Sequence, residues 1–252
     1  MRKIAVALYK GGVGKTTTAV NLAAGLANQG CNVLLVDMDT QGQAAQALGV
    51  KAKSGLADLV SGKRSAEETI LLARERLWIL AGGRELAGLK REIARKDFGS
   101  EQTVSDALAP LDGRYDYVIV DTAPGWDSLT INALFYATEI IAPVALESMA
   151  LQGLREFGVS LSAIQRYHRR LGLNYILPTF MDRRVKKSQQ IYDLLLEYYH
   201  ARLCDPIRYN VRLSEAPGCG QTIFEFASRS AGALDYQALV MRILEDEDCC
   251  CT

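Results

Sequence analysis

The chain has 252 residues, of which 49% are hydrophobic, and its 29 basic and 29 acidic side chains give a formal net charge of zero. This length and composition allow a full core, and α/β domains of this size commonly remain undivided, so we expect one domain over residues 1–252. The zero net charge argues against a globally basic nucleic-acid binder. Without a run of about 18 apolar residues or a signal-peptide profile, the sequence predicts a cytoplasmic protein.

The first apolar run, Ile4–Leu8, leads into a glycine-rich segment and a helix predicted over Thr16–Gln29. In such a turn, backbone N–H groups and the helix dipole converge on one concavity that favours phosphate. Lys15 would reach the β- and γ-phosphates, and the Thr16 hydroxyl would complete the shell of a Mg²⁺ ion. We therefore expect a nucleoside triphosphate with Mg²⁺, held by Lys10, Gly11, Gly12, Val13, Gly14, Lys15, Thr16 and Thr17.

Two further apolar runs end in carboxylates. The run Val33–Val36 leads to Asp37 and Asp39, and the run Tyr117–Val120 leads to Asp121. An acid at the end of a strand beside the phosphates can orient the attacking water or support Mg²⁺. Asp121 has the place of a Walker B carboxylate, which reaches the metal through water. We therefore assign Asp39 and Asp121 to the metal and catalytic site.

The remaining strand-length runs are Trp78–Leu80, Ile140–Val144 and Tyr175–Leu177. Near-continuous apolar strands that alternate with helical patterns predict a doubly wound α/β fold, in which helices cover both faces of a mostly parallel sheet. We place the segment Lys51–Lys96 at the sheet edge and assign it no chemistry. The acidic tail, residues 245–252, ends in three cysteines and a threonine and is expected to be a disordered, frayed end.

Basic side chains are concentrated between Ile164 and Arg212, where ten Lys or Arg residues stand against four Asp or Glu residues. A local basic face attracts DNA phosphates without sequence preference. An ordinary solvated helix surface accounts for the same count. The charge alone therefore leaves both interpretations open.

The glycine-rich segment departs from the ordinary P-loop at Tyr9, where a glycine is expected, and carries a second lysine at Lys10. This is the deviant Walker A pattern, and with it the chain resembles the ParA/MinD family of ATPases. The segment 37–42 resembles the family's D-x-D-P-Q-G switch, with Thr40 in place of the proline. The segment 121–125 resembles its D-x-P-P element, with Ala123 in place of one proline.

The C-terminal half resembles one branch of that family. The segment Arg208–Pro217 is very similar to the R-N-V-R-L-S-E-A-P element of chromosomal ParA proteins, also called Soj, and residues 230–236 fit their S-x-G-A-x-x-Y ending. In that branch, one arginine of the T-x-x-D-x-R turn and one of the N-V-R element bind DNA without sequence preference. By resemblance, these roles fall on Arg184 and Arg212.

The resemblance also implies a mechanism. Lys10 would cross the interface of an ATP-dependent homodimer and touch the partner's phosphates, and Lys15 and Asp39 would serve hydrolysis. Glu147 would steady the pocket or Lys10, or would be a rim carboxylate without a role. The ATP dimer would bind double-stranded DNA of the nucleoid, and a ParB-like activator would trigger hydrolysis. The cargo would be a chromosome, a plasmid or another body.

A MinD-like, membrane-associated spatial regulator is the alternative within the same family. Such a protein needs a basic amphipathic helix at its C-terminus, where lipid phosphates would lie. Residues 241–248 are acidic instead. We therefore expect no membrane binding.

Overall fold

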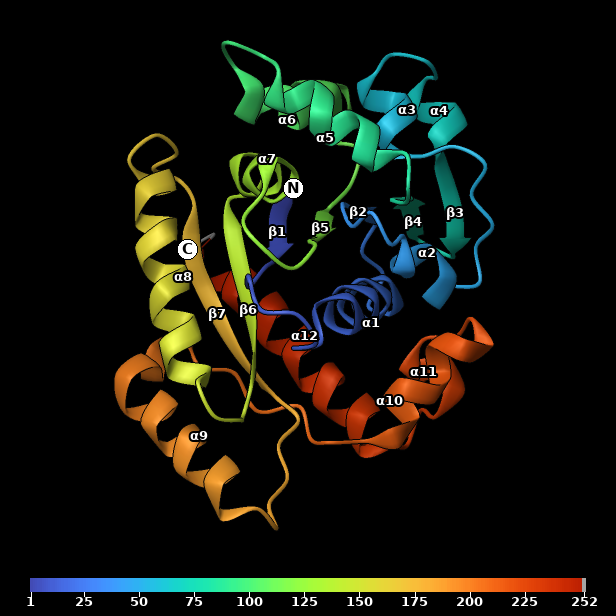
Figure 1. Ribbon diagram of the computed structural model, residues 1–252. Helices are drawn as coiled ribbons and strands as arrows, with labels where there is room; N and C mark the ends of the chain where they lie inside the picture. The colour runs from blue at the N-terminus through green and yellow to red at the C-terminus, as the bar shows by residue number, and fades with distance from the viewer. Residues whose placement is uncertain (251–252) are drawn as a thin grey trace.

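A computed structural model of the chain describes the backbone of residues 1–250 and the side chains of residues 1–246. A seven-stranded sheet with the strand order β3-β4-β2-β5-β1-β6-β7 lies between two layers of helices (Figure 1). Neighbouring strands pair in parallel, except for the antiparallel pair of β3 and β4. The strands are β1 Arg2–Val6, β2 Val33–Asp37, β3 Ile70–Arg74, β4 Leu77–Leu80, β5 Tyr117–Asp121, β6 Glu139–Ala145 and β7 Gly172–Thr179.

The helices cover both faces of the sheet. Successive side chains of a strand point to opposite faces, so Leu35 of β2 enters one apolar cluster and Val36 enters the other. The layer over Leu35 contains α1 Lys15–Asn28, α2 Gln43–Ala47, α10 Val211–Glu215, α11 Ile223–Phe226 and α12 Ala231–Cys250. The other layer contains α3 Leu56–Val60, α4 Ala66–Thr69, α5 Leu86–Ala94, α6 Thr103–Leu108, α7 Ser128–Tyr136, α8 Ala150–Gln165 and α9 Lys186–Tyr199. Short 3₁₀ turns are η1 Ser100–Gln102, η2 Ala109–Leu111, η3 His200–Arg202 and η4 Ala216–Cys219.

The doubly wound α/β fold predicted from the sequence is confirmed. The central strands β2 and β5 are buried at every position, which explains their continuous apolar runs. The strand β3, which lies in the segment 51–96 and forms one edge of the sheet, was not predicted from the sequence. An edge strand is only half-buried, and the exposed Leu72 shows why its sequence lacks a clear pattern.

The helix α12 continues to Cys250, while the frayed end expected over residues 245–252 stays a prediction. Two contacts fix its last described turns to the sheet. The Tyr175 hydroxyl donates a hydrogen bond to Asp246 (2.8 Å), and the Arg2 guanidinium donates one to the Ile243 carbonyl (2.6 Å). The part of the prediction that concerns residues 251–252 lies outside the described residues.

Candidate functional site

Three neighbouring strands bring the predicted site residues together at the end of the sheet where these strands terminate. The glycine-rich turn follows β1, while Asp37 and Asp121 are the last residues of β2 and β5. In the parallel register Asp121 pairs with Asp37 on one side and with Val6 on the other. The two carboxylates therefore lie next to the turn, at the carboxyl ends of the strands, where ligands of such sheets bind.

The glycine-rich turn has the backbone shape of a phosphate-binding loop. Gly12 and Gly14 have φ angles of 73° and 89°, which favour glycine, and α1 begins at Lys15 immediately after them. The Lys15 side chain is only 6% exposed, and its ammonium donates a hydrogen bond to the Lys10 carbonyl (2.8 Å). Burial lowers the pKa of Lys15, although the charges of two nearby carboxylates oppose this shift. The Thr179 hydroxyl, which the sequence analysis did not single out, donates to the Val13 carbonyl (3.0 Å) and ties β7 to the loop.

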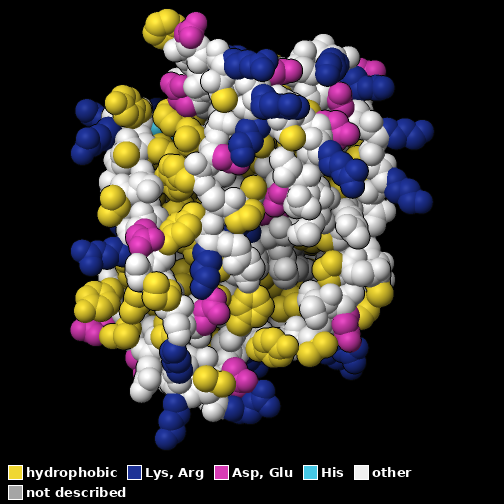
Figure 2. All heavy atoms as spheres, viewed as in Figure 1, with side chains coloured by type: hydrophobic (Ala, Val, Ile, Leu, Met, Phe, Trp, Pro, Cys, Tyr) yellow, Lys and Arg dark blue, Asp and Glu magenta, His cyan; other side chains and the backbone are white. Residues whose placement is uncertain are grey.

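A cleft of about 600 Å³ opens over this turn. Figure 2 shows the face of the molecule hollowed near its middle, where Figure 1 has the turn before α1. Seven of the residues predicted for the nucleotide and metal site line this cleft: Gly11, Gly12, Gly14, Lys15, Thr16, Thr17 and Asp39. Val13 and Asp121 lie buried beneath, and Lys10 points elsewhere.

Asp121 has the properties of a residue that supports a cation. Its side chain is fully buried, and neither carboxylate oxygen has a hydrogen-bond partner among the described residues. Burial, followed by the charge of Asp37, raises the pKa of Asp121 well above its usual range. A nearby cation would satisfy this orphaned group.

These residues fit Mg²⁺. This ion prefers oxygen ligands and is usually bound by one or two carboxylates together with substrate phosphates and water. Among the described residues, no group of three or more His, Cys, Asp and Glu side chains could hold a metal ion by itself. Thr16, Asp39 and Asp121 would therefore share the ion with the phosphates and water.

The two acids of the switch segment have different roles in the structure. Asp37 is fully buried and accepts hydrogen bonds from the backbone N–H groups of Asp39 (2.9 Å) and Ala44 (3.1 Å). Burial raises the pKa of Asp37 to about 7. Asp39 lines the cleft, and its Oδ1 accepts from the Gln41 N–H (2.9 Å). Asp37 thus shapes the switch segment, and Asp39 lines the cleft.

A glycine pair behind the switch was missed by the sequence analysis. Gly82 follows β4, and a Cβ at this position would lie 2.6 Å from the Asp39 carbonyl oxygen and 2.8 Å from Asp37 Oδ1. The Gly83 N–H donates a hydrogen bond to the same Asp39 carbonyl (3.0 Å). The sequence signal was a Gly-Gly pair directly after an apolar strand, which marks a close approach of backbones. The segment 51–96 therefore supports the site.

The Lys10 side chain contacts the segment just before α8 of the same chain. Its ammonium forms an ion pair with Glu147 Oε1 (2.5 Å), and both side chains are partly exposed. The preceding Tyr9 hydroxyl donates a hydrogen bond to Glu156 of α8 (2.5 Å). Glu147 is thus in contact with Lys10, one of the roles left open for it.

Each of the two predicted DNA-binding arginines follows one of two chain segments that pair with each other. Met181 and Arg208 form a parallel bridge, and the Tyr209 N–H donates to the Met181 carbonyl (3.0 Å). Arg184 follows the first strand of this pair, and 86% of its side chain is exposed beside its ion-pair partner Asp182. The second strand leads to α10 and its arginine.

Arg212 stands in the first turn of α10, with 59% of its side chain exposed. The Asn210 side chain caps this helix by accepting a hydrogen bond from the Arg212 N–H (2.9 Å). Figure 2 shows Lys and Arg side chains projecting at the lower edge of the molecule, where Figure 1 has α9, α10 and α11. Both predicted arginines therefore have largely exposed side chains.

An apolar pocket of about 230 Å³ adjoins the phosphate turn at Gly14 and Thr17. Phe180, with a φ angle of 57°, and Tyr209 contribute aromatic side chains to it. Its position beside the helix N-terminus suits the base of a nucleotide whose phosphates lie on the turn. The fold and the site together define a P-loop nucleotide-binding protein.

Comparisons with known proteins agree with this class. A family model described as an AAA domain matches residues 1–173. The chain is 38% identical over 246 residues to the chromosome-partitioning ATPase Soj of Thermus thermophilus, covering 97% of this chain and 96% of that protein. It is 34% identical over 246 residues to the sporulation initiation inhibitor protein Soj of Bacillus subtilis, covering 95% and 97%.

Solved structures give the same result. The cobyrinic acid a,c-diamide synthase of Mycobacterium smegmatis, determined with bound ADP and magnesium, has a TM-score of 0.85 and 30% identity over 98% of this chain and 96% of that chain. The septum site-determining protein MinD of Pyrococcus horikoshii, complexed with Mg-ADP, has a TM-score of 0.79 over 96% of this chain and 95% of that one. At 22% identity, it supports the fold alone.

The chain belongs to the ParA/Soj family of partition ATPases, as its deviant Walker A turn indicates. In the described part of the chain, no helix is both long enough and apolar enough to span a membrane.

Proposed function

We propose that this chain is a partition ATPase whose ATP-bound dimer binds DNA and whose hydrolysis of ATP releases it. The observation that carries the proposal is the cleft itself. Lys15, Thr16 and Asp39 line it, and the unpartnered Asp121 is buried beneath them. The chain is also similar over nearly its whole length to the Soj ATPase of Thermus thermophilus.

The phosphates of ATP would lie over the N-terminus of α1. Backbone N–H groups of the turn and the Lys15 ammonium would bind them, because both present positive charge to one concavity. Mg²⁺, shared by the phosphates with Thr16 and Asp121, would neutralise charge that develops during phosphoryl transfer. Asp39 would orient the attacking water, since its Oδ1 is fixed by the Gln41 N–H while the side chain faces the cleft.

Dimerisation would depend on Lys10. Its ion pair with Glu147 is exposed, and such pairs contribute only about 0–1 kcal/mol, so the ammonium is available to a stronger acceptor. The triphosphate bound to a second subunit is such an acceptor. Loss of the γ-phosphate on hydrolysis would weaken this contact, and the dimer would open.

DNA binding would use Arg184 and Arg212. Both are exposed, and each subunit of a dimer would add its own pair. When phosphate contacts are joined in one rigid body, the affinity of the dimer exceeds that of either half, and it falls steeply with salt. A ParB-like activator that stimulates hydrolysis would then release DNA locally and move a chromosome, plasmid or other cargo.

The experiment measures binding to a duplex without sequence preference in the ATP state, in an Asp39→Ala background that slows hydrolysis. We expect Arg212→Glu or Arg184→Glu to weaken binding strongly and to lower the salt slope by about two, one phosphate contact for each subunit. The matched control is Arg114→Glu, which reverses another exposed, ion-paired arginine. Equal losses in all three variants would contradict a specific DNA face, and retained binding in Arg212→Glu would contradict the role of α10.

A further inference from the structure

A structural connection links the nucleotide switch to α10. Helix α2 follows the switch segment directly and is held to it, because the Ala44 N–H donates to Asp37 Oδ2. Two residues after the end of α2, the backbone at Gly49 meets Gly220, which directly follows η4. A Cβ on Gly220 would lie only 2.8 Å from the Gly49 Cα. Both glycines have positive φ angles, 68° and 65°, so this close contact requires glycine on both sides.

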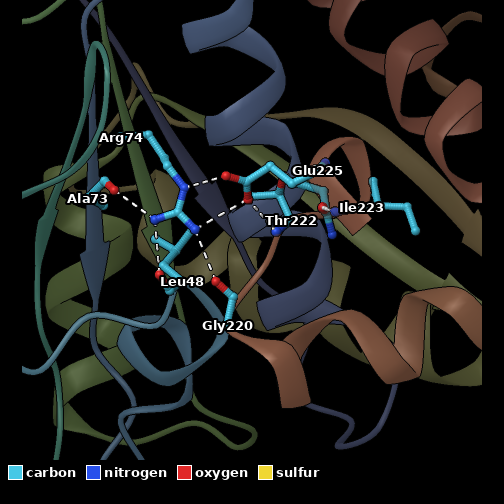
Figure 3. Close-up of polar contacts among 8 residues, drawn as sticks. Leu48, Ala73, Arg74, Gly220, Thr222, Ile223 and Glu225 are labelled. Carbon is cyan, nitrogen blue, oxygen red and sulfur yellow. Dashed lines mark hydrogen bonds and ion pairs between the residues drawn. The ribbon is translucent and has the colours of Figure 1, made fainter. Parts of the chain in front are cut away.

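Arg74, on the edge strand β3, contacts both sides of this junction between the end of α2 and Gly220. Figure 3 shows its guanidinium between the end of α2 and the segment that leads to α11. One nitrogen donates to the Leu48 carbonyl (3.1 Å), and another donates to the Gly220 carbonyl (3.0 Å). The guanidinium also pairs with both carboxylate oxygens of Glu225, at 2.5 and 3.2 Å. A planar guanidinium can serve all these acceptors at once, which a lysine ammonium cannot.

The connection continues to the proposed DNA contact. Glu225 caps α11 by accepting a hydrogen bond from the Thr222 N–H (2.8 Å), so the ion pair with Arg74 also fixes this helix. The next residue is Phe226, and the centroid of its ring lies 6.0 Å from the guanidinium carbon of Arg212. The chain of contacts therefore runs from the switch through α2, Arg74 and α11 to the arginine of α10.

Part of the space between α2 and η4 is open. A cavity of about 250 Å³ lies between α1, α2 and η4, and it extends from Thr16 of the phosphate turn to Pro217 of η4. Side chains do not fill this space, so the contacts of Arg74 and of the Gly49–Gly220 pair help to hold the end of α2 to the segment after η4.

We propose that Arg74 is a positioning residue that holds α2 and the α10–α11 segment as one body, so that the ATP state of the switch sets the geometry of Arg212. The inference rests on the proposed function, because it concerns how the DNA face responds to ATP. Two DNA faces reinforce each other in a dimer only when both can engage at once. Without Arg74, the dimer would form on ATP, and its two faces would no longer be held in register.

The experiment compares wild type with Arg74→Ala, Arg74→Lys and the control Arg114→Ala, which breaks another exposed ion pair of an arginine, with Glu67 of α4. Fluorescence anisotropy with a random-sequence duplex gives the ratio of DNA affinity in ATP to that in ADP. We expect both Arg74 variants to lower this ratio by about tenfold, within the range of allosteric couplings. Binding of a fluorescent ATP analogue and dimerisation on ATP remain as in wild type and in the control, which a general loss of structure would not allow.

A wild-type ratio in both Arg74 variants would overturn the inference. A wild-type protein that binds DNA equally in ATP and ADP would instead refute the proposed function, and amide hydrogen exchange of residues 211–220 then tests the connection by itself. If ATP changes the exchange there in wild type and not in the Arg74 variants, the connection holds without DNA. If ATP changes it equally in all of them, or in none, the connection does not exist.

Discussion

Replacement of Gly82 by alanine tests whether the turn after β4 supports the switch. The added Cβ would lie 2.6 Å from the Asp39 carbonyl oxygen, 2.8 Å from the Asp37 carbonyl oxygen and 2.8 Å from Asp37 Oδ1. Cβ atoms are essentially never found within 3.0 Å of other heavy atoms, and two of these neighbours are backbone atoms, so the switch segment or the turn must move. Overpacking of this kind costs about 1–3 kcal/mol.

Thermal unfolding and ATP turnover measure the consequence. For a chain of this size we expect Gly82→Ala to lower the Tm by about 2–12 °C. Turnover falls as well, because the carbonyl that moves belongs to Asp39. The matched control is Gly88→Ala in α5, where a Cβ meets nothing within 4 Å. In a helix interior this change stabilises by about 0.5–1 kcal/mol. A Gly82→Ala protein with the Tm and turnover of wild type would refute the reasoning.

Three further predictions concern groups whose contacts the structure defines. The pKa of Asp37, raised by burial to about 7, means that the folded chain binds more protons than the unfolded one between about pH 4 and 7, so stability falls as the pH rises. In urea unfolding without nucleotide or Mg²⁺ we expect a stability lower by about 2 kcal/mol or more at pH 7.5 than at pH 5.5, because the raised pKa of Asp121 acts in the same direction, and equal values would contradict it. Glu147→Gln frees Lys10 from an exposed ion pair, and a dimer contains two such pairs. The dimerisation constant with ATP should therefore rise by up to about thirtyfold, and weaker dimers in analytical ultracentrifugation would contradict this. Tyr236→Phe removes a buried hydroxyl that hydrogen-bonds to the Thr18 hydroxyl (3.1 Å), and urea unfolding should show a loss of about 1 kcal/mol, against which an unchanged midpoint would count.

The sequence predicts the fold well where structure follows from local chemistry. The positive φ angles at Gly12 and Gly14, the helix that starts at Lys15, and the acids that end buried strands all follow from short segments. The strand β3 could not be predicted in this way, because its pattern depends on an edge position and on antiparallel pairing with β4.

The supporting contacts of the site depend on long-range geometry. Gly82 is 43 positions from Asp39 in the sequence, and only the folded sheet brings it against the switch. Arg74 lies in a segment of mixed charge with no motif, and its partner Glu225 is 151 residues away. Such residues carry no local signal, because their role is defined by the backbone atoms that they meet.

The central claim is that ATP controls the binding of DNA, and one titration tests it most directly. The affinity of the wild-type protein for a random-sequence duplex is measured at low salt and over a salt series, with ATP, with ADP and without nucleotide. The account predicts tight, salt-sensitive binding with ATP and much weaker binding in the other two states. Equal binding in all three states, or none with ATP, would contradict it.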